Sequence, residues 1–326
     1  MEERKIYTDI VLEAAETLSA GSKGSMDGVE IETSEIDCGV LTWVRVTNEK
    51  GAKALNKPVG NYVTIESQSM REGDVDAHEM IIAALADAIG KLKKKGNGDV
   101  LVVGLGNIGV TPDALGPKVV SKTFVTRYIT DKVPDEEQGK TRPVAAISPG
   151  VMGTTGIETR EIVKGVCDKI SPSLVIVIDA LAARKTSRVN ATIQLSDTGL
   201  SPGGGMGNSR GVINEEFLGT QVIAIGVPTV VDAATLVSDS LDLLINEMMD
   251  GESEKESPFY KELSRLSNQE KYTIVRGVLE PYAGNMFVTP KEVDEVIGRL
   301  SNIIANAINV ALHEGITLAD INRFMY

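Results

Sequence analysis

The stretch DVLVVGLGNIGVTPDALGP, Asp99 to Pro117, leads from an apolar run through a glycine-rich turn to an acidic residue. Residues 100–103 are all aliphatic, as in parallel strands that are covered on both faces. Glycines allow the chain to turn sharply and to expose its N–H groups at the carboxyl end of the strand, where open α/β sheets bind ligands. This stretch therefore predicts a buried parallel strand that brings Asp113 to the edge of a site.

A second stretch, SLVIVIDALAAR from Ser173 to Arg184, repeats this arrangement. Its aliphatic run, Leu174 to Ile178, predicts another buried strand, which ends at Asp179. If the two strands are parallel neighbours, Asp113 and Asp179 meet at one edge of the sheet, where paired carboxylates can share a proton and activate water. Each aspartate could instead cap the turn or helix that follows it, and this structural alternative remains open.

The rest of the chain alternates predicted strands and helices, which favours a three-layer α/β/α sandwich with a mostly parallel sheet and a small β-rich section. Two segments interrupt the alternation: a glycine-rich loop at 196–211 and a charged stretch at 250–271. The predicted elements are the β-rich section at about 28–66, helices at Asp76–Lys95, Gly156–Ile170 and Pro290–Leu312, and apolar runs at Pro143–Ser148 and Gln221–Ile225.

Composition limits the classes of function. The 326 residues carry a net charge of −13, which argues against direct binding to a nucleic-acid backbone and favours basic proteins as partners. Cys38 and Cys167 form no CxxC motif, in keeping with a reducing, cytoplasmic setting. The charged amino terminus is unlike a signal peptide, and no stretch is apolar enough to span a membrane.

A dinucleotide site is one alternative, because Gly104, Gly106 and Gly109 spell GxGxxG after a predicted strand. The next strand, however, ends in Ser148 rather than in the acidic residue that would hold a ribose. A non-catalytic Rossmann-like binding module therefore stays a secondary hypothesis.

Several motifs in the same order resemble the spore germination protease family of bacteria. They are GLGNIGVTPDALGP, SPGVMGTTGIET at Ser148–Thr159, VIDALAAR, GLSPGGGMGNSRG at Gly199–Gly211 and GVPTVVDA at Gly226–Ala233. The resemblance extends from TDIVLEA, Thr8–Ala14, over nearly the whole chain. It implies the fold of the hydrogenase maturation endopeptidases and an atypical aspartic endopeptidase that degrades small acid-soluble spore proteins in the cytoplasm of the spore core. The two essential aspartates of the family fall on Asp113 and Asp179.

The same resemblance implies a homotetrameric zymogen that removes its own leader. The matching bond is Asp9–Ile10, which gives a propeptide at 1–9 and a catalytic α/β domain at 10–326. No cofactor and no metal are expected, although a metal that bridges the two acids, as in a metal-dependent hydrolase of the hydrogenase maturation type, is a further alternative.

For the chemistry, the sequence favours general acid–base hydrolysis without a covalent intermediate. Backbone N–H groups near Gly104, Gly106 and Asn107, or in the loop that begins at Gly150, are candidates for stabilising the oxyanion. Arg210, in the glycine-rich loop, is a candidate for contact with the substrate.

Overall fold

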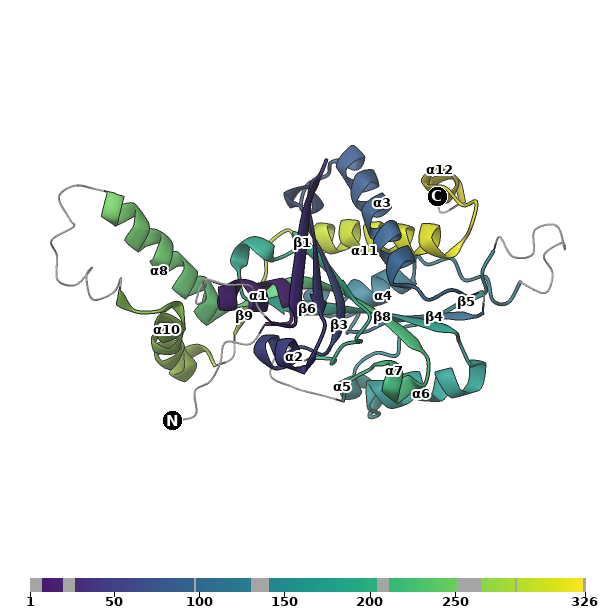
Figure 1. The fold of residues 1–326 in the computed structure, drawn as a ribbon, viewed down its shortest axis with the longest axis horizontal. Coiled ribbons are helices and arrows are strands. Elements are labelled where there is room, and N and C mark those ends of the chain that lie inside the picture. Colours follow the sequence, from purple (N-terminus) through teal and green to yellow (C-terminus); the bar gives the residue numbers. More distant parts are fainter. Residues whose placement is uncertain are drawn as a thin grey trace.

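A computed structural model of the chain describes residues 8–19, 27–96, 98–129, 141–203, 211–250, 265–284 and 286–324. Its centre is a nine-stranded sheet, with helices on both faces (Figure 1). The strands are β1 (Val29–Ile36), β2 (Gly39–Val46), β3 (Gly60–Glu66), β4 (Val100–Gly104), β5 (Val144–Ile147), β6 (Leu174–Ala183), β7 (Thr192–Ser196), β8 (Gln221–Asp232) and β9 (Phe287–Val288). The helices are α1 (Val11–Ser19), α2 (Glu49–Leu55), α3 (Val75–Leu92), α4 (Leu115–Val120), α5 (Met152–Thr155), α6 (Thr159–Ile170), α7 (Glu215–Leu218), α8 (Ala233–Asp250), α10 (Asn268–Ala283), α11 (Val293–Leu312) and α12 (Leu318–Phe324).

The sheet has a parallel part and an antiparallel part. The strand order is β1-β2-β3-β7-β8-β6-β4-β5, and β9 pairs with β8 outside this path. Strands β5, β4, β6 and β8 are parallel neighbours, whereas β7, β3, β2 and β1 extend the sheet in antiparallel fashion. The α/β fold class predicted from the sequence is confirmed, and residues 28–66 form β1, β2, α2 and β3 at one end of the same sheet.

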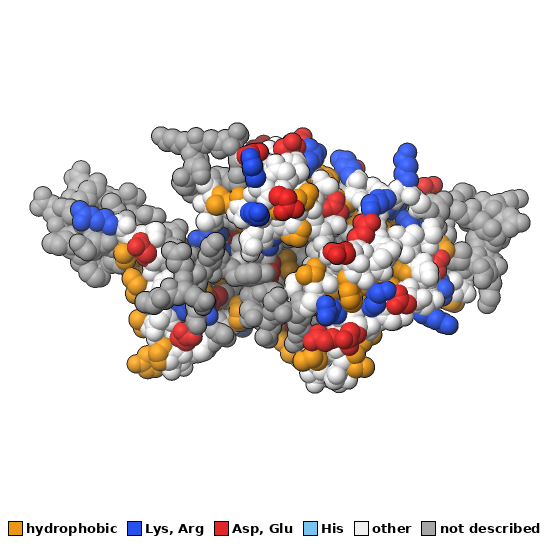
Figure 2. Space-filling model, turned by 60° about the horizontal axis from the view of Figure 1, so that its bottom comes forward, with side chains coloured by type: hydrophobic (Ala, Val, Ile, Leu, Met, Phe, Trp, Pro, Cys, Tyr) orange, Lys and Arg blue, Asp and Glu red, His pale blue; other side chains and the backbone are white. Residues whose placement is uncertain are grey.

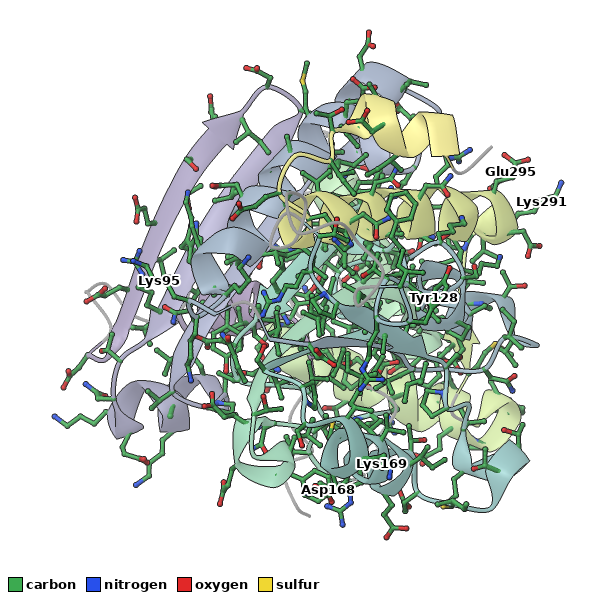
Figure 3. The ribbon with its side chains drawn as sticks, turned by 90° about the vertical axis from the view of Figure 1, so that its right-hand side faces the viewer. Lys95, Tyr128, Asp168, Lys169, Lys291 and Glu295 are labelled. Atoms are coloured by element: carbon green, nitrogen blue, oxygen red, sulfur yellow. The ribbon has the colours of Figure 1, made fainter. Side chains whose placement is uncertain are left out.

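Two apolar layers hold the helices to the sheet. On one face, α3 and α11 pack on aliphatic side chains of the strands around Val102, Ile176 and Ile225. On the other face, α6 and α7 cover side chains such as Val103 and Val177. Figure 3 shows this separation, with Glu295 near the start of α11 on one side and Asp168 and Lys169 of α6 on the other. Helices α8 and α10 extend away from the sheet (Figure 1).

Helix limits follow local capping. Helix α3 begins one residue before the predicted Asp76, because the Asp74 carboxylate accepts a hydrogen bond from the Ala77 N–H at 3.1 Å and caps the helix. It ends at Leu92, three residues before the predicted end. The last long helix begins at Val293 rather than at Pro290.

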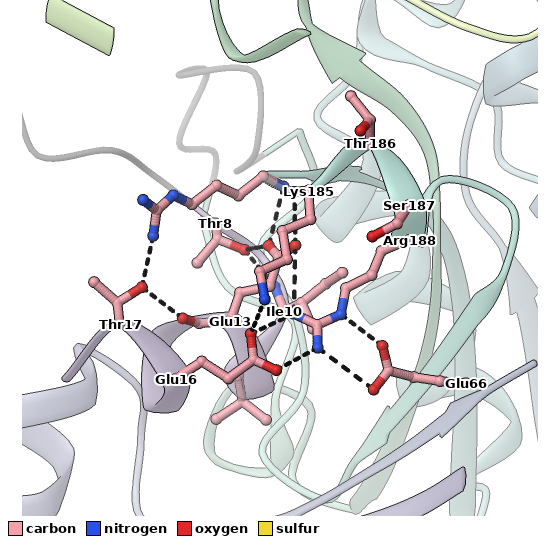
Figure 4. A network of polar contacts seen from close by, with 12 residues as sticks. Thr8, Ile10, Glu13, Glu16, Thr17, Glu66, Lys185, Thr186, Ser187 and Arg188 are labelled. Atoms are coloured by element: carbon pink, nitrogen blue, oxygen red, sulfur yellow. Dashed lines mark hydrogen bonds and ion pairs between the residues drawn. The ribbon is translucent and has the colours of Figure 1, made fainter. Parts of the chain in front are cut away.

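A buried ionic network fixes α1 to the body of the protein (Figure 4). The guanidinium of Arg188, only 5% exposed, is 2.6 Å from Glu16 of α1 and 2.6 Å from Glu66 of β3. Glu13, 1% exposed, accepts hydrogen bonds from the N–H groups of Arg184 and Lys185, directly after β6. The segment around Asp9 is therefore held beside the end of β6.

The helices of the described residues include none that is both long and apolar enough to cross a bilayer. On the face shown in Figure 2, lysines and arginines lie among acidic side chains and do not form a continuous basic patch.

Candidate active site

A cavity of about 280 Å³ opens beside the parallel part of the sheet. Three carboxylates line it, those of Asp9, Asp113 and Asp179. The other lining residues come from the turn before Asp113, from β6, from the glycine-rich segment and from β8 and β9: Val110, Pro112, Ala180, Leu181, Ala182, Ser201, Gly203, Thr229, Val230, Phe287 and Thr289. The sequence prediction that the two distant acidic residues lie together agrees with this geometry.

Asp113 is positioned by the glycine turn after β4. It ends a short 3-10 helix, Thr111–Asp113, and its Oδ2 accepts a hydrogen bond from the Asn107 N–H at 2.7 Å. The turn must carry glycine at 106, where φ is +111° and a Cβ atom would lie 2.0 Å from the Asp113 carbonyl oxygen. Helix α4 has Ala114 at its N-cap position, so Asp113 does not cap this helix.

Asp179 lies within β6, which continues to Ala183 instead of ending at Asp179 as the sequence suggested. No helix follows directly, so Asp179 has no capping role. Burial raises the pKa of this carboxyl well above its usual range, and the charges of Asp113 and Asp9 raise it further. Hydrogen bonds from the backbone of Ala180 and Gly203 lower the pKa but do not cancel this rise. Asp179 is only 6% exposed, and a carboxyl with this pKa retains its proton at higher pH than an ordinary aspartate.

Asp9 is the third acid of the cavity, and its side chain is held by β6. Its Oδ2 accepts a hydrogen bond from the Ala182 N–H at 3.3 Å. The next residue, Ile10, is fully buried among apolar side chains that include Val189 and Val231. The Asp9–Ile10 bond therefore joins a residue in the cavity to a residue in a hydrophobic pocket.

The other predicted site residues lie elsewhere. Gly104, Gly106, Asn107 and Gly150 are not among the residues that line this cavity, and the Asn107 N–H is directed to Asp113. Arg210 lies outside the described residues, whereas Ser201 and Gly203 of the same loop do line the cavity.

Sequence reasoning did not identify the contributions of β8 and β9. Thr229, Phe287 and Thr289 line the cavity, yet they belong to no motif of reactive residues. Only the pairing of β9 with β8 brings residues 287–288 to the site, and the sequence of a two-residue strand gives no signal of that pairing.

Substitution of Asp179 by asparagine is expected to stabilise the protein at neutral pH. The folded protein holds the Asp179 proton more tightly than the unfolded chain does, so this carboxyl lowers stability as the pH rises through its unfolded pKa toward its folded pKa. The variant should exceed the wild type in free energy of unfolding by at least about 1 kcal/mol at pH 7. Urea unfolding at pH 7 and at pH 4 measures this difference, which should shrink at the lower pH. The exposed control Asp168→Asn should show little change at either pH, and an equal gain in Asp179→Asn at both pH values would contradict the assignment.

The fold and this cavity define an α/β protein with a carboxylate-lined site beside parallel strands, a site suited to acid–base hydrolysis. Within the described ranges, no group of three or more His, Cys, Asp or Glu side chains has the arrangement of a metal site.

Comparisons with known proteins identify the family. The family model described as germination protease matches residues 6–265 and 247–325. A germination protease of Caldanaerobacter subterraneus subsp. tengcongensis is 47% identical over 98% of this chain and 98% of its own length. One from Clostridium perfringens is 46% identical over 98% of this chain and 99% of its own length. The chain belongs to the germination protease family and is a peptidase of spore germination.

A search of solved structures found a nickel–iron hydrogenase maturation protease, HycI, from Thermococcus kodakarensis. It is 17% identical and has a TM-score of 0.33, over 69% of this chain and 98% of its own.

Proposed function

We propose that this chain is an aspartic endopeptidase that begins the degradation of small acid-soluble spore proteins, and that it is made as a zymogen that cleaves its own Asp9–Ile10 bond. The observation that carries this proposal is the meeting of Asp113, Asp179 and Asp9 at one cavity. Two of these residues belong to the predicted catalytic pair, and the third precedes the predicted cleavage point.

The raised pKa of Asp179 supports a division of roles within the pair. Because its pKa is raised, Asp179 is the protonated partner in this proposal, while Asp113, which accepts the Asn107 N–H, is the ionised partner. Ionised Asp113 takes a proton from water as the water oxygen bonds to the scissile carbonyl carbon, and Asp179 donates a hydrogen bond to the carbonyl oxygen. When the C–N bond breaks, the proton that Asp113 took from water passes to the leaving nitrogen, which gives a carboxylic acid and a free amine and leaves Asp113 ionised again.

The position of Ile10 supports the zymogen proposal. Residues 1–9 are the proposed leader, and 10–326 the mature chain. Because Ile10 and Val11 are fully buried, the chain after the cleavage point is anchored whether or not the leader is present. Assembly as a homotetramer and a place in the cytoplasm of the spore core, both suggested by the resemblance to the family, complete the proposal.

Intact-mass analysis of the purified protein tests this function. Incubated alone, the protein is expected to lose Met1–Asp9, and with an acid-soluble spore protein it should produce a small set of defined fragments. Both reactions should continue after treatment with a chelator. Loss of cleavage that added divalent cations restore would instead support the metal-dependent hydrolase, and an intact substrate in every condition would contradict the proposed function.

A further inference from the structure

The Asp9 carbonyl oxygen, at the proposed cleavage point, accepts two side-chain hydrogen bonds. The Lys57 Nζ donates to it at 3.0 Å, and the Gln194 Nε2 donates at 3.2 Å. The same Lys57 ammonium also donates to the Thr8 carbonyl oxygen at 3.0 Å. A peptide carbonyl with an ammonium and an amide directed at it is polarised in the sense that favours attack by water.

Gln194 holds the chain on both sides of this peptide bond. While its Nε2 donates to the Asp9 carbonyl, its Oε1 accepts the Val11 N–H at 2.6 Å. The residue between them, Ile10, donates its N–H to the Thr8 hydroxyl at 3.1 Å. All three partners of Gln194 and Lys57 in this segment are backbone groups, so the contacts do not depend on the side chains of the bound peptide.

The sheet places Gln194 and Asp179 in one row. Asp179 of β6 pairs with Gly226 of β8, and Gly226 pairs with Gln194 of β7. Paired residues in neighbouring strands project from the same face of a sheet. Gln194 and Asp179 therefore lie on either side of Gly226, and their strands are two strand spacings, about 10 Å, apart. The Leu181 side chain occupies the space above Gly226, where a Cβ atom would lie 2.3 Å from Leu181 Cδ1.

Two cavities meet at Asp9. The cavity of the carboxylates lies on one side, and a second, of about 170 Å³, lies on the other and is lined by Lys57, Gln194 and Gly226. Asp9, Leu181 and Ser201 line both cavities. Asp9, the last residue of the proposed leader, therefore lies where the two cavities adjoin.

We propose that Lys57 and Gln194 are catalytic residues that hold the scissile carbonyl and stabilise its oxyanion, first in self-cleavage and then in cleavage of protein substrates. This inference rests on the proposed function. It assigns the groups that polarise the scissile carbonyl, in addition to the carboxylates that activate water. As water adds, the carbonyl oxygen gains a third lone pair, so that Lys57, Gln194 and protonated Asp179 can donate to it together. Burial lowers the pKa of Lys57. The negative charges of Asp9 and Glu13 raise it in part, and the pKa stays below that of an ordinary lysine.

The test compares Gln194→Glu and Lys57→Met with the wild type. Gln194→Glu keeps the shape of the side chain but removes its N–H donors, and Lys57→Met removes the ammonium. Self-cleavage is followed by intact mass, and the processed enzymes are assayed on a synthetic peptide with the sequence of residues 5–16. Each variant should lower kcat about 100-fold and change KM less than about 3-fold, because a lost oxyanion donor acts on the transition state. Lys53→Met, on the exposed side of α2, is the matched control and should cleave at the wild-type rate.

Chemical rescue separates this role from a structural one. Lys57→Cys should be as slow as Lys57→Met, and alkylation with 2-bromoethylamine should restore cleavage by returning an ammonium at nearly the same reach. Wild type treated in the same way controls for reaction at Cys38 and Cys167, which are free thiols. If folded Gln194→Glu and Lys57→Met both keep kcat within about 3-fold of an active wild type, the inference is wrong while the proposed function stands. If the wild type itself cleaves neither its leader nor the peptide, the proposed function fails.

Discussion

Asparagine at position 113 or 179 is expected to reduce peptide cleavage by about 10³-fold or more. In the proposed mechanism, Asp113→Asn removes the base that accepts a proton from water, and Asp179→Asn removes the acid that donates to the scissile carbonyl. General acid–base groups each contribute about 10²–10⁴-fold to a rate, and groups that act together lose most of that benefit when either is removed. Both variants should also retain their leader.

Steady-state kinetics on a defined peptide measures this loss, with circular dichroism to show that each variant is folded. Asp168→Asn provides the matched control, since Asp168 is an exposed aspartate of α6 that pairs with Lys164. Its kcat/KM should equal that of the wild type. If a folded Asp113→Asn or Asp179→Asn variant cleaves the peptide at the wild-type rate, the substituted carboxylate has no catalytic role.

Arg188→Met is expected to lower the free energy of unfolding by about 3 kcal/mol. Although burial alone would lower the pKa of Arg188, its hydrogen bonds and charge interactions with Glu16 and Glu66 raise it above the ordinary arginine value. Without the guanidinium, Glu16 and Glu66 lose their buried partner, and Glu13 loses a positive charge 3.7 Å away. Removal of one member of a buried ionic network is costly because the remaining, partly buried charges lose their main opposite charge.

Guanidinium chloride unfolding measures the effect as a lower transition midpoint at unchanged slope. Lys185→Met is the control, because Lys185 also pairs with Glu16 but its side chain is 52% exposed. It should cost less than about 1 kcal/mol. Equal losses in the two variants would show that the network is no stronger than a surface ion pair.

The network also links stability to the site. Glu13 and Glu16 lie in the first turns after the proposed cleavage point, and Arg188 follows the strand that carries Asp179 (Figure 4). The contacts that fix α1 therefore also fix the distance of Asp9 from the pair of carboxylates.

Local sequence was enough to predict the α/β class and the meeting of Asp113 and Asp179 at one site. The aliphatic runs before the glycine turn and before Asp179 are typical of buried parallel strands, and the carboxyl ends of such strands meet at one edge. The full extent of β6 was missed because residues 180–183, three alanines and a leucine, indicate neither a strand nor its end. Pairing with β8 through a register shift after Leu181 determines that extension, and pairing is a long-range property.

The contacts of Lys57 and Gln194 with the Asp9 carbonyl, on which their proposed roles rest, could not be predicted from sequence for a similar reason. Lys57 follows a short surface helix and Gln194 lies in an ordinary strand, so neither carries a local signal. Their meeting at the Asp9 carbonyl depends on the path of the amino-terminal segment across the sheet. The oxyanion role predicted for the glycine loops stays a prediction: the residues predicted for it do not line the carboxylate cavity, and the Asn107 N–H donates to Asp113.

The most direct test of the paired-carboxylate mechanism is the rate of peptide cleavage by the double variant Asp113→Asn/Asp179→Asn beside each single variant. If the two carboxyls act as one unit, the double variant should be no slower than the slower single variant, within about 3-fold, because the first substitution already removes the unit. Losses that multiply, so that the double variant is slower by the product of the single effects, would contradict shared action on one water molecule.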